Sequence, residues 1–241
     1  RSAGVQKLFL DALESAALPA LRHAAPASAA GAQAFSECRR EGSGARISVS
    51  GLSGDPSARS DLEVSVADGG DLLVRQSAEH PRPGLLAASW AISGIDASRV
   101  RLILPANGGI SIDGQRGPGT LSFPWPGSWQ AAIAIVQGES GGFSIWTEDP
   151  EATFKSLEVR RQGRELTLAL GAESREPAGE ARRVLSPVWR IRVHRGDWKV
   201  PAAAFREAMA RARAIEPIGR RRPAWIGDIR LVARVSNDVT V

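Results

Sequence analysis

The chain has 241 residues, of which 43% are hydrophobic and 24% are charged, and its formal net charge is +5. Such a composition argues against a disordered, collagen-like or coiled-coil protein, and no window approaches the roughly 18 uninterrupted apolar residues of a membrane helix. Three of the 31 basic residues are lysine, which leaves 28 arginines, and most of these alternate with Asp and Glu. We therefore expect the basic residues to form a solvated mixed surface and not a face that binds nucleic acid.

The residues that most often bind metals are sparse. Cys38 is the single cysteine, which excludes an intrachain disulfide and a zinc site of the two-Cys or four-Cys kind. His23, His80 and His194 lie far apart and show no metal-ligand spacing. We expect no metal and no other cofactor.

Residues 1–34 predict an N-terminal helix followed by a linker. Apolar residues recur at helical spacing from Val5 to about His23, and residues 26–34 are rich in Ala, Ser, Pro and Gly, a linker composition. Asp11 and Glu14 interrupt the apolar stretch, so a signal peptide fits poorly. The compartment stays open, with a secreted or periplasmic location favoured over a cytoplasmic one.

Residues 35–200 predict a large antiparallel β-sandwich, so the fold class is mainly β. The clearest signal is a hairpin over residues 61–76, with alternating apolar residues on both sides of Asp68-Gly69-Gly70-Asp71. About ten short strands without intervening helices favour a sandwich of the supersandwich type. The other predicted strands are 46–52, 86–92, 100–104, 110–112, 131–136, 143–147, 156–160, 165–170 and 188–194.

Two of these strands carry extra information. The strand 131–136 is apolar without a break, which predicts burial on both faces near the middle of a sheet. The strand 188–194 alternates between two sets of residues. Trp189, Ile191 and Val193 form the apolar set, and Arg190, Arg192 and His194 form the basic set. One side of that strand is expected in the core and the other in solvent or in a groove.

The C-terminal part predicts a linker and then a lone strand. Pro201 suits the first turn of a helix that runs to about residue 215. A basic connector that contains Arg220-Arg221-Arg222 follows the helix. We therefore assign residues 201–225 to a linker helix and a connector. Residues 226–241 begin with the strand pattern 226–235. A strand after a helix, with no partner behind it, is expected to begin a domain that this chain lacks.

Aromatic residues next to carboxylates form the candidate binding site. Trp125 and Trp129 lie in residues 123–130, where two prolines predict a stiff, irregular segment that is not a central strand. Trp146 precedes Glu148 and Asp149. Indole faces stack on the C–H faces of sugars while carboxylates accept hydrogen bonds from hydroxyl groups. These five residues are the predicted carbohydrate contacts. For any single Trp, however, a place in the core of a protein that has no Tyr is the favoured interpretation.

Catalytic signatures are mostly absent, because the sequence has no nucleophile-elbow, phosphate-loop, zinc-protease or dinucleotide motif. Glu148 and Asp149 resemble a glycosidase pair only in composition, since neighbours on a strand point to opposite faces. A turn or cap role before Pro150 is the favoured interpretation of both acids. We predict no catalytic residue in this chain.

An ordered series of motifs resembles bacterial glycoside hydrolases in which a galactose-mutarotase-like β-supersandwich precedes a catalytic (β/α)₈ barrel, as in endo-α-N-acetylgalactosaminidase-like and α-galactosidase-like enzymes. The resemblance covers roughly residues 86–235. It rests on Pro105-Ala-Asn-Gly-Gly109, Phe123-Pro-Trp-Pro-Gly127 with Trp129, Gly141-Gly142 leading to Glu148-Asp149, Lys155, Gly196-Asp197-Trp198, Phe205-Arg206 and Pro223-Ala-Trp225.

The resemblance implies a non-catalytic sandwich domain that supports or contributes to carbohydrate binding. It places the catalytic carboxylates in the barrel, so the expected partners are an oligosaccharide or glycoconjugate and a C-terminal barrel domain or partner chain. Two alternatives stay open: a structural or protein-interaction module without a ligand, and nucleic-acid binding through the arginines of residues 211–222.

Overall fold

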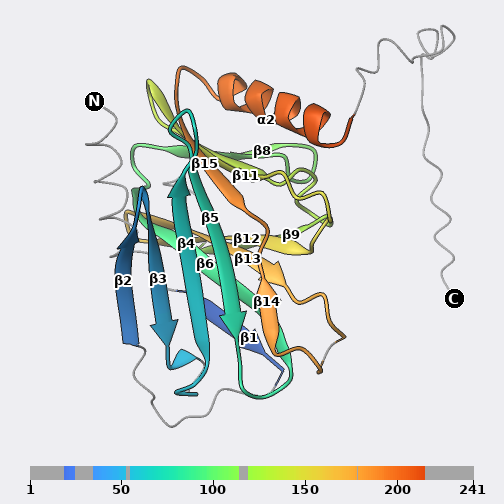
Figure 1. Ribbon diagram of the computed structural model, residues 1–241. Helices are drawn as coiled ribbons and strands as arrows, with labels where there is room; N and C mark the ends of the chain where they lie inside the picture. The colour runs from blue at the N-terminus through green and yellow to red at the C-terminus, as the bar shows by residue number, and fades with distance from the viewer. Residues whose placement is uncertain (1–18, 25–34, 53–54, 114–118, 178, 215–241) are drawn as a thin grey trace, which may run out of the picture.

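The computed structural model describes residues 19–24, 35–52, 55–113, 119–177 and 179–214. Two antiparallel sheets lie face to face (Figure 1), and the main apolar core lies between them. This confirms the predicted mainly-β fold with large antiparallel sheets. The smaller sheet has the strand order β1 (Ala20–His23), β6 (Leu85–Asp96), β13 (Glu165–Glu173), β12 (Lys155–Gln162) and β9 (Thr120–Trp125).

The larger sheet carries most of the chain. Its order is β2 (Phe35–Glu41), β3 (Gly44–Ser50), β4 (Arg59–Val66), β5 (Leu72–Glu79), β15 (Trp189–Arg195), β11 (Gly141–Thr147), β10 (Ile133–Gln137), β7 (Arg101–Leu104) and β8 (Ile110–Asp113), and β14 (Arg183–Leu185) also pairs with β5. The helix α2 (Lys199–Ala212) follows β15 and contacts β15 and β11. The predicted hairpin is β4 and β5, joined in register from Arg59↔Glu79 to Val66↔Leu72.

The core lies between the inner faces of the two sheets. Fully buried residues from both sheets meet there, among them Trp90, Leu168, Leu102 and Trp189. Burying such apolar side chains is the main favourable term in folding. Alternate residues of β5, such as Leu72 and Val74, point into this core, so the period of two in the sequence is the cause of the layer arrangement.

A second apolar layer covers the outer face of the large sheet. Ile133, Ile135 and Trp146 are buried there and pack against Ala202 and Phe205 of α2. As a result β10 is buried on both faces, which confirms the prediction for 131–136. The helix predicted after the sandwich is also confirmed, although it begins two residues before Pro201.

Two predictions near the N-terminus and in the Pro-containing stretch are wrong. Residues 20–23 form β1, paired with β6, and do not continue a helix. The open edge of the long strand β6 outweighs the local helical spacing, so the sandwich includes residues before the predicted boundary at 35. The rest of the predicted N-terminal helix lies outside the described residues, as does the predicted strand 226–235.

The stretch Phe123-Pro124-Trp125 is the end of strand β9, not an irregular segment. It pairs with β12 at the edge of the small sheet, where a proline is tolerated because one side of the strand needs no backbone donor. The inference that it is no central strand is therefore confirmed. The strand β15 is mixed: Trp189 and Ile191 are buried as expected, but Val193 is 62% exposed.

Truncation of the core tests this packing. Leu168→Ala is expected to lower the free energy of unfolding by about 2–5 kcal/mol, because it removes buried methyl groups and leaves a cavity. Leu185→Ala, the same change at a side chain that is 51% exposed, is expected to cost less than about 0.5 kcal/mol. Urea denaturation measures both, and equal losses would contradict the assignment of the core.

The buried imidazole of His194 predicts a pH dependence. Burial lowers the pKa of His194 below its ordinary value, so the unfolded chain takes up the proton first as the pH falls. Stability is then complete above about pH 6.5 and decreases below it, by at most about 1.4 kcal/mol per pH unit. Urea denaturation at pH 7.5 and 5.5 should show a larger acid loss for the wild type than for His194→Phe. The same loss in both would contradict this role.

Candidate binding cleft

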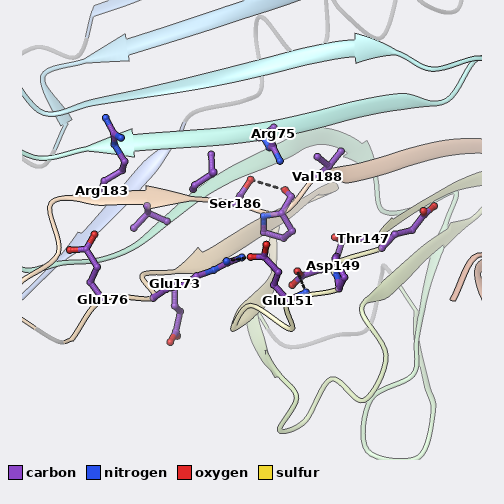
Figure 2. A pocket seen from close by; sticks show the side chains of 15 residues that line it. Arg75, Thr147, Asp149, Glu151, Glu173, Glu176, Arg183, Ser186 and Val188 are labelled. Atoms are coloured by element: carbon purple, nitrogen blue, oxygen red, sulfur yellow. Dashed lines mark hydrogen bonds and ion pairs between the residues drawn. The ribbon is translucent and has the colours of Figure 1, made fainter. Parts of the chain in front are cut away.

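A cleft of about 570 Å³ lies where the chain crosses twice between the two sheets. Residues 148–154 lead from β11 in the large sheet to β12 in the small one, and residues 174–182 lead from β13 back to β14. Figure 2 shows the first crossover with Asp149 and Glu151 opposite Ser186 and Val188. Neither crossover forms the cleft alone, so the site depends on the topology of the sandwich.

Charged side chains of both signs line the cleft. Carboxylates come from both crossovers, and Arg75 reaches the site from β5. Several charges are already neutralised: Glu151 forms an ion pair with Arg175. The charged and polar lining residues are Arg75, Thr147, Glu148, Asp149, Glu151, Glu173, Arg175, Glu176, Arg183 and Ser186.

Asp149 holds the first crossover in place. Its Oδ1 accepts a hydrogen bond from the backbone N–H of Glu151 at 3.2 Å, and its Oδ2 accepts one from the N–H of Thr153 at 2.7 Å. Its backbone carbonyl accepts a hydrogen bond from Arg213 at 3.2 Å, just after α2. The turn role favoured for this residue is thus present, because short carboxylate side chains satisfy the N–H groups of the turn that follows them.

A buried ion pair joins Asp149 to the small sheet. The Nζ of Lys155 lies 2.9 Å from Oδ2 of Asp149, and both side chains are at most 4% exposed. The same ammonium lies 3.8 Å from the ring centroid of Trp125, a cation–π contact. Burial lowers the pKa of Lys155, and the hydrogen bond to Asp149 opposes this change. Lys155 thus connects two of the predicted site residues.

Glu148 belongs to a different network. It is exposed, lines the cleft, and lies 3.3 Å from Arg190, which in turn pairs with Asp71 at 2.9 Å. Burial alone would raise the pKa of Asp71, but the hydrogen bonds from Arg192 and Arg190 outweigh burial, so the pKa lies below its ordinary value. Glu148 and Asp149 thus have different ion-pair partners, but β11 ends at Thr147, so the expected alternation of strand neighbours does not apply to them.

Two of the three predicted indole platforms are corrected by the structure. Trp129 is fully buried, stacks on Trp189 with 6.3 Å between ring centroids, and donates its indole N–H to the carbonyl of Ile133 at 3.0 Å. Trp146 is 1% exposed and lies under α2. Neither ring has a face that a ligand could reach, because both fill apolar layers. Trp125 is half-buried beneath Lys155.

Glu148 and Asp149 are thus the two predicted residues that line the cleft. Sequence reasoning missed Arg75, Arg175 and Arg183, which contribute its positive charge. Arg75 has an outward position on a correctly predicted hairpin strand, but nothing local distinguishes it from other exposed arginines. Only the pairing of β14 with β5 shows which of them share a site.

The described side chains of the cleft include many hydrogen-bonding groups but no cluster of metal ligands. Among residues 19–24, 35–52, 55–113, 119–177 and 179–214, no group of three His, Cys, Asp or Glu side chains could hold a metal ion. None of the helices in that part of the chain is long and apolar enough to cross a membrane. Guanidinium groups donate and carboxylates accept, so both kinds of hydrogen-bonding group are available in the cleft.

Comparison with known proteins returned solved structures alone. No protein-family model and no curated protein matches the chain. The galactosidase domain of the α-galactosidase–sucrose kinase AgaSK is similar with a TM-score of 0.43 and 9% identity, over 74% of this chain and 27% of that chain. The GH36 α-galactosidase AgaA from Geobacillus stearothermophilus is similar with a TM-score of 0.42 and 8% identity, over 74% and 27%.

Both solved proteins are α-galactosidases, one of the two kinds of enzyme that the sequence motifs resemble. The chain spans about a quarter of the length of each.

The buried pair gives a prediction for the cleft. Asp149→Ala is expected to lower the free energy of unfolding by about 3–5 kcal/mol, because it leaves the Lys155 ammonium buried without its counter-charge. The double variant Asp149→Ala with Lys155→Met removes that charge and should regain a part of the loss. Urea denaturation of the two single variants and the double variant measures the coupling. Additive losses would contradict a stabilising interaction between the two side chains.

Proposed function

We propose that this chain is a non-catalytic β-sandwich domain of a glycoside-hydrolase-like protein, and that the cleft between its two crossovers contributes to carbohydrate binding. The observation that carries the proposal is the cleft itself, a space of about 570 Å³ that is lined by both carboxylates and guanidinium groups. The ordered motifs over residues 86–235 support the association with glycoside hydrolases.

The chemistry of the cleft fits a polyhydroxylated ligand. A sugar hydroxyl both donates and accepts hydrogen bonds, so it can bridge a carboxylate such as Glu148 and a guanidinium such as Arg75. Charge-assisted hydrogen bonds of this kind are stronger than neutral ones. The apolar side chains of Leu185 and Val188 also line the cleft and can contact the C–H groups of a sugar ring. This arrangement replaces the indole platforms that the sequence predicted.

The role of Asp149 is structural within this proposal. Its carboxylate is held by Lys155 and by two backbone N–H groups, so it positions the crossover and does not act as an acid or base. The proposed ligand contacts are Glu148, Glu151 and Arg75. Trp125 supports the same crossover through Lys155.

A structural or protein-interaction module without a sugar ligand is the second candidate. The observation that favours it is the burial of Trp129 and Trp146, since an open indole face is the usual sign of a sugar-binding surface. In that case the charged cleft is a solvated surface feature. The two candidates differ in one measurable property, the affinity for oligosaccharides.

Isothermal titration calorimetry with galactose-, glucose- and N-acetylhexosamine-containing oligosaccharides tests the proposal. The wild type is expected to bind at least one of them, and Arg75→Ala should weaken that binding roughly tenfold, the loss of about one charge-assisted hydrogen bond. Arg40→Ala, the same change on the exposed edge strand β2, should leave the affinity unchanged. Absence of binding to all three classes would reject the carbohydrate role and favour the structural module.

A further inference from the structure

A trough separate from the cleft lies on the outer face of the large sheet, along strands β10, β7 and β8. Its apolar part has a volume of about 400 Å³ and lies beside the first turn of α2. Its polar part has a volume of about 600 Å³. Arg101 and Ser111 line both parts, so the two are adjacent. Both volumes are within the range of small-molecule pockets, roughly 300–1,000 Å³.

The apolar part of the trough has a floor of isoleucine side chains and an indole at its side. Ile135 of β10 pairs with Ile103 of β7, which pairs in turn with Ser111 of β8, so the three form one row across the sheet. Ile133 lies on the same face as Ile135, because alternate residues of a strand point the same way. Trp198, just before α2, is 38% exposed and lines the same space. An alkyl chain fits a surface of this kind.

The polar part of the trough contains the next row of the same strands. Gln137 pairs with Arg101, and Arg101 with Asp113. Each lies two residues from a member of the preceding row and therefore on the same face of the sheet. The other two charged residues of the polar part, Arg99 and Glu139, also carry opposite charges. The formal charges sum to zero while donors and acceptors are both present, which suits a neutral head group with hydroxyls.

Gln137 adds a buried acceptor that lacks a donor. The residue is 5% exposed, and its amide N–H groups donate to the main-chain carbonyls of Gly138 at 2.7 Å and Gly196 at 3.1 Å. These two contacts establish which amide atom is the nitrogen, because a carbonyl oxygen accepts and does not donate. The other atom, Oε1, has no hydrogen-bond partner among the described residues. A buried acceptor of this kind is unfavourable, and a ligand hydroxyl is a donor of the right kind to satisfy it.

We infer that the trough binds an amphiphile with an apolar tail and a neutral, hydroxyl-rich head, such as an alkyl glycoside. The tail lies over Ile135 and Ile103 beside Trp198, and the head lies at Arg101 and Gln137. This inference goes beyond the proposed function, since the trough and the cleft are lined by different residues.

Isothermal titration calorimetry of the full 241-residue chain with n-octyl β-D-glucopyranoside, kept below its micelle concentration, tests the inference. Octyl glucoside is expected to bind roughly tenfold or more tightly than n-butyl β-D-glucopyranoside, because each further buried CH₂ strengthens binding by up to about fourfold. It should also bind roughly tenfold or more tightly than octanoate or octylammonium, since a charged head meets a like charge in the polar part.

Two variants locate the tail and the head. Trp198→Ala should weaken octyl glucoside binding roughly tenfold and reduce its advantage over butyl glucoside, because the indole contacts the tail. Phe154→Ala, a matched change at a ring that is 60% exposed in the first crossover, should leave the affinity unchanged. Arg101→Ala should weaken both glucosides roughly tenfold and keep their ratio, because it removes a contact to the head. Circular dichroism confirms that each variant is folded.

Three results would overturn the inference. The first is equal affinity for octyl and butyl glucoside, or for octyl glucoside and the two charged amphiphiles. The second is unchanged binding in both Trp198→Ala and Arg101→Ala, which would place the ligand elsewhere. The third is no binding by the wild type, which would leave the trough to a second copy or to another part of the chain. Arg75→Ala in the cleft should not affect octyl glucoside, so a failure of this inference is distinguishable from a failure of the proposed function.

Discussion

The ion pair between Asp149 and Lys155 is the interaction on which the candidate site depends. It joins the crossover after β11 to the first residue of β12, and so ties the two sheets together at the cleft. The same aspartate caps the turn at Glu151 and Thr153, and its carbonyl holds Arg213 after α2. A buried pair of this kind costs desolvation energy on folding, which these additional hydrogen bonds offset in part.

The large sheet has two different outer surfaces, and this difference separates the possible functions. Over β10 and β11 the outer face is apolar and lies under α2. Over β3, β4 and β5 it carries cross-strand ion pairs such as Arg46–Glu63 and Arg59–Glu79, which keep that part of the sheet solvated. The cleft lies at the charged side. Hence the two parts of the sheet suit partners of different polarity.

Much of the fold follows from the sequence because alternation determines which face of a strand is buried. The hairpin of β4 and β5 and the doubly buried strand β10 were predictable for this reason. The strand β1 was not, since its four residues are fixed by the open edge of β6 and not by their own pattern. The same holds for β14, whose three residues are too short to show a period.

The candidate site was less predictable, because its parts are distant in the sequence. The role of Asp149 as a turn residue follows from its position before Pro150. By contrast, Trp129 and Trp146 were expected at a ligand, and the sequence alone does not distinguish an indole in the core from one at the surface. Arg75 and Arg183 meet the crossovers only through the pairing of β5 with β14.

The cleft between the crossovers is the proposed carbohydrate site. An NMR titration of the isotope-labelled chain with the best-binding oligosaccharide tests it directly, because each backbone amide reports its own surroundings. If the cleft binds carbohydrate, chemical-shift changes are expected to concentrate in residues 147–151, 173–176 and 183–188, with β2 and β3 unchanged. Shifts confined to the surroundings of α2 and β8, or no shifts at any residue, would contradict it.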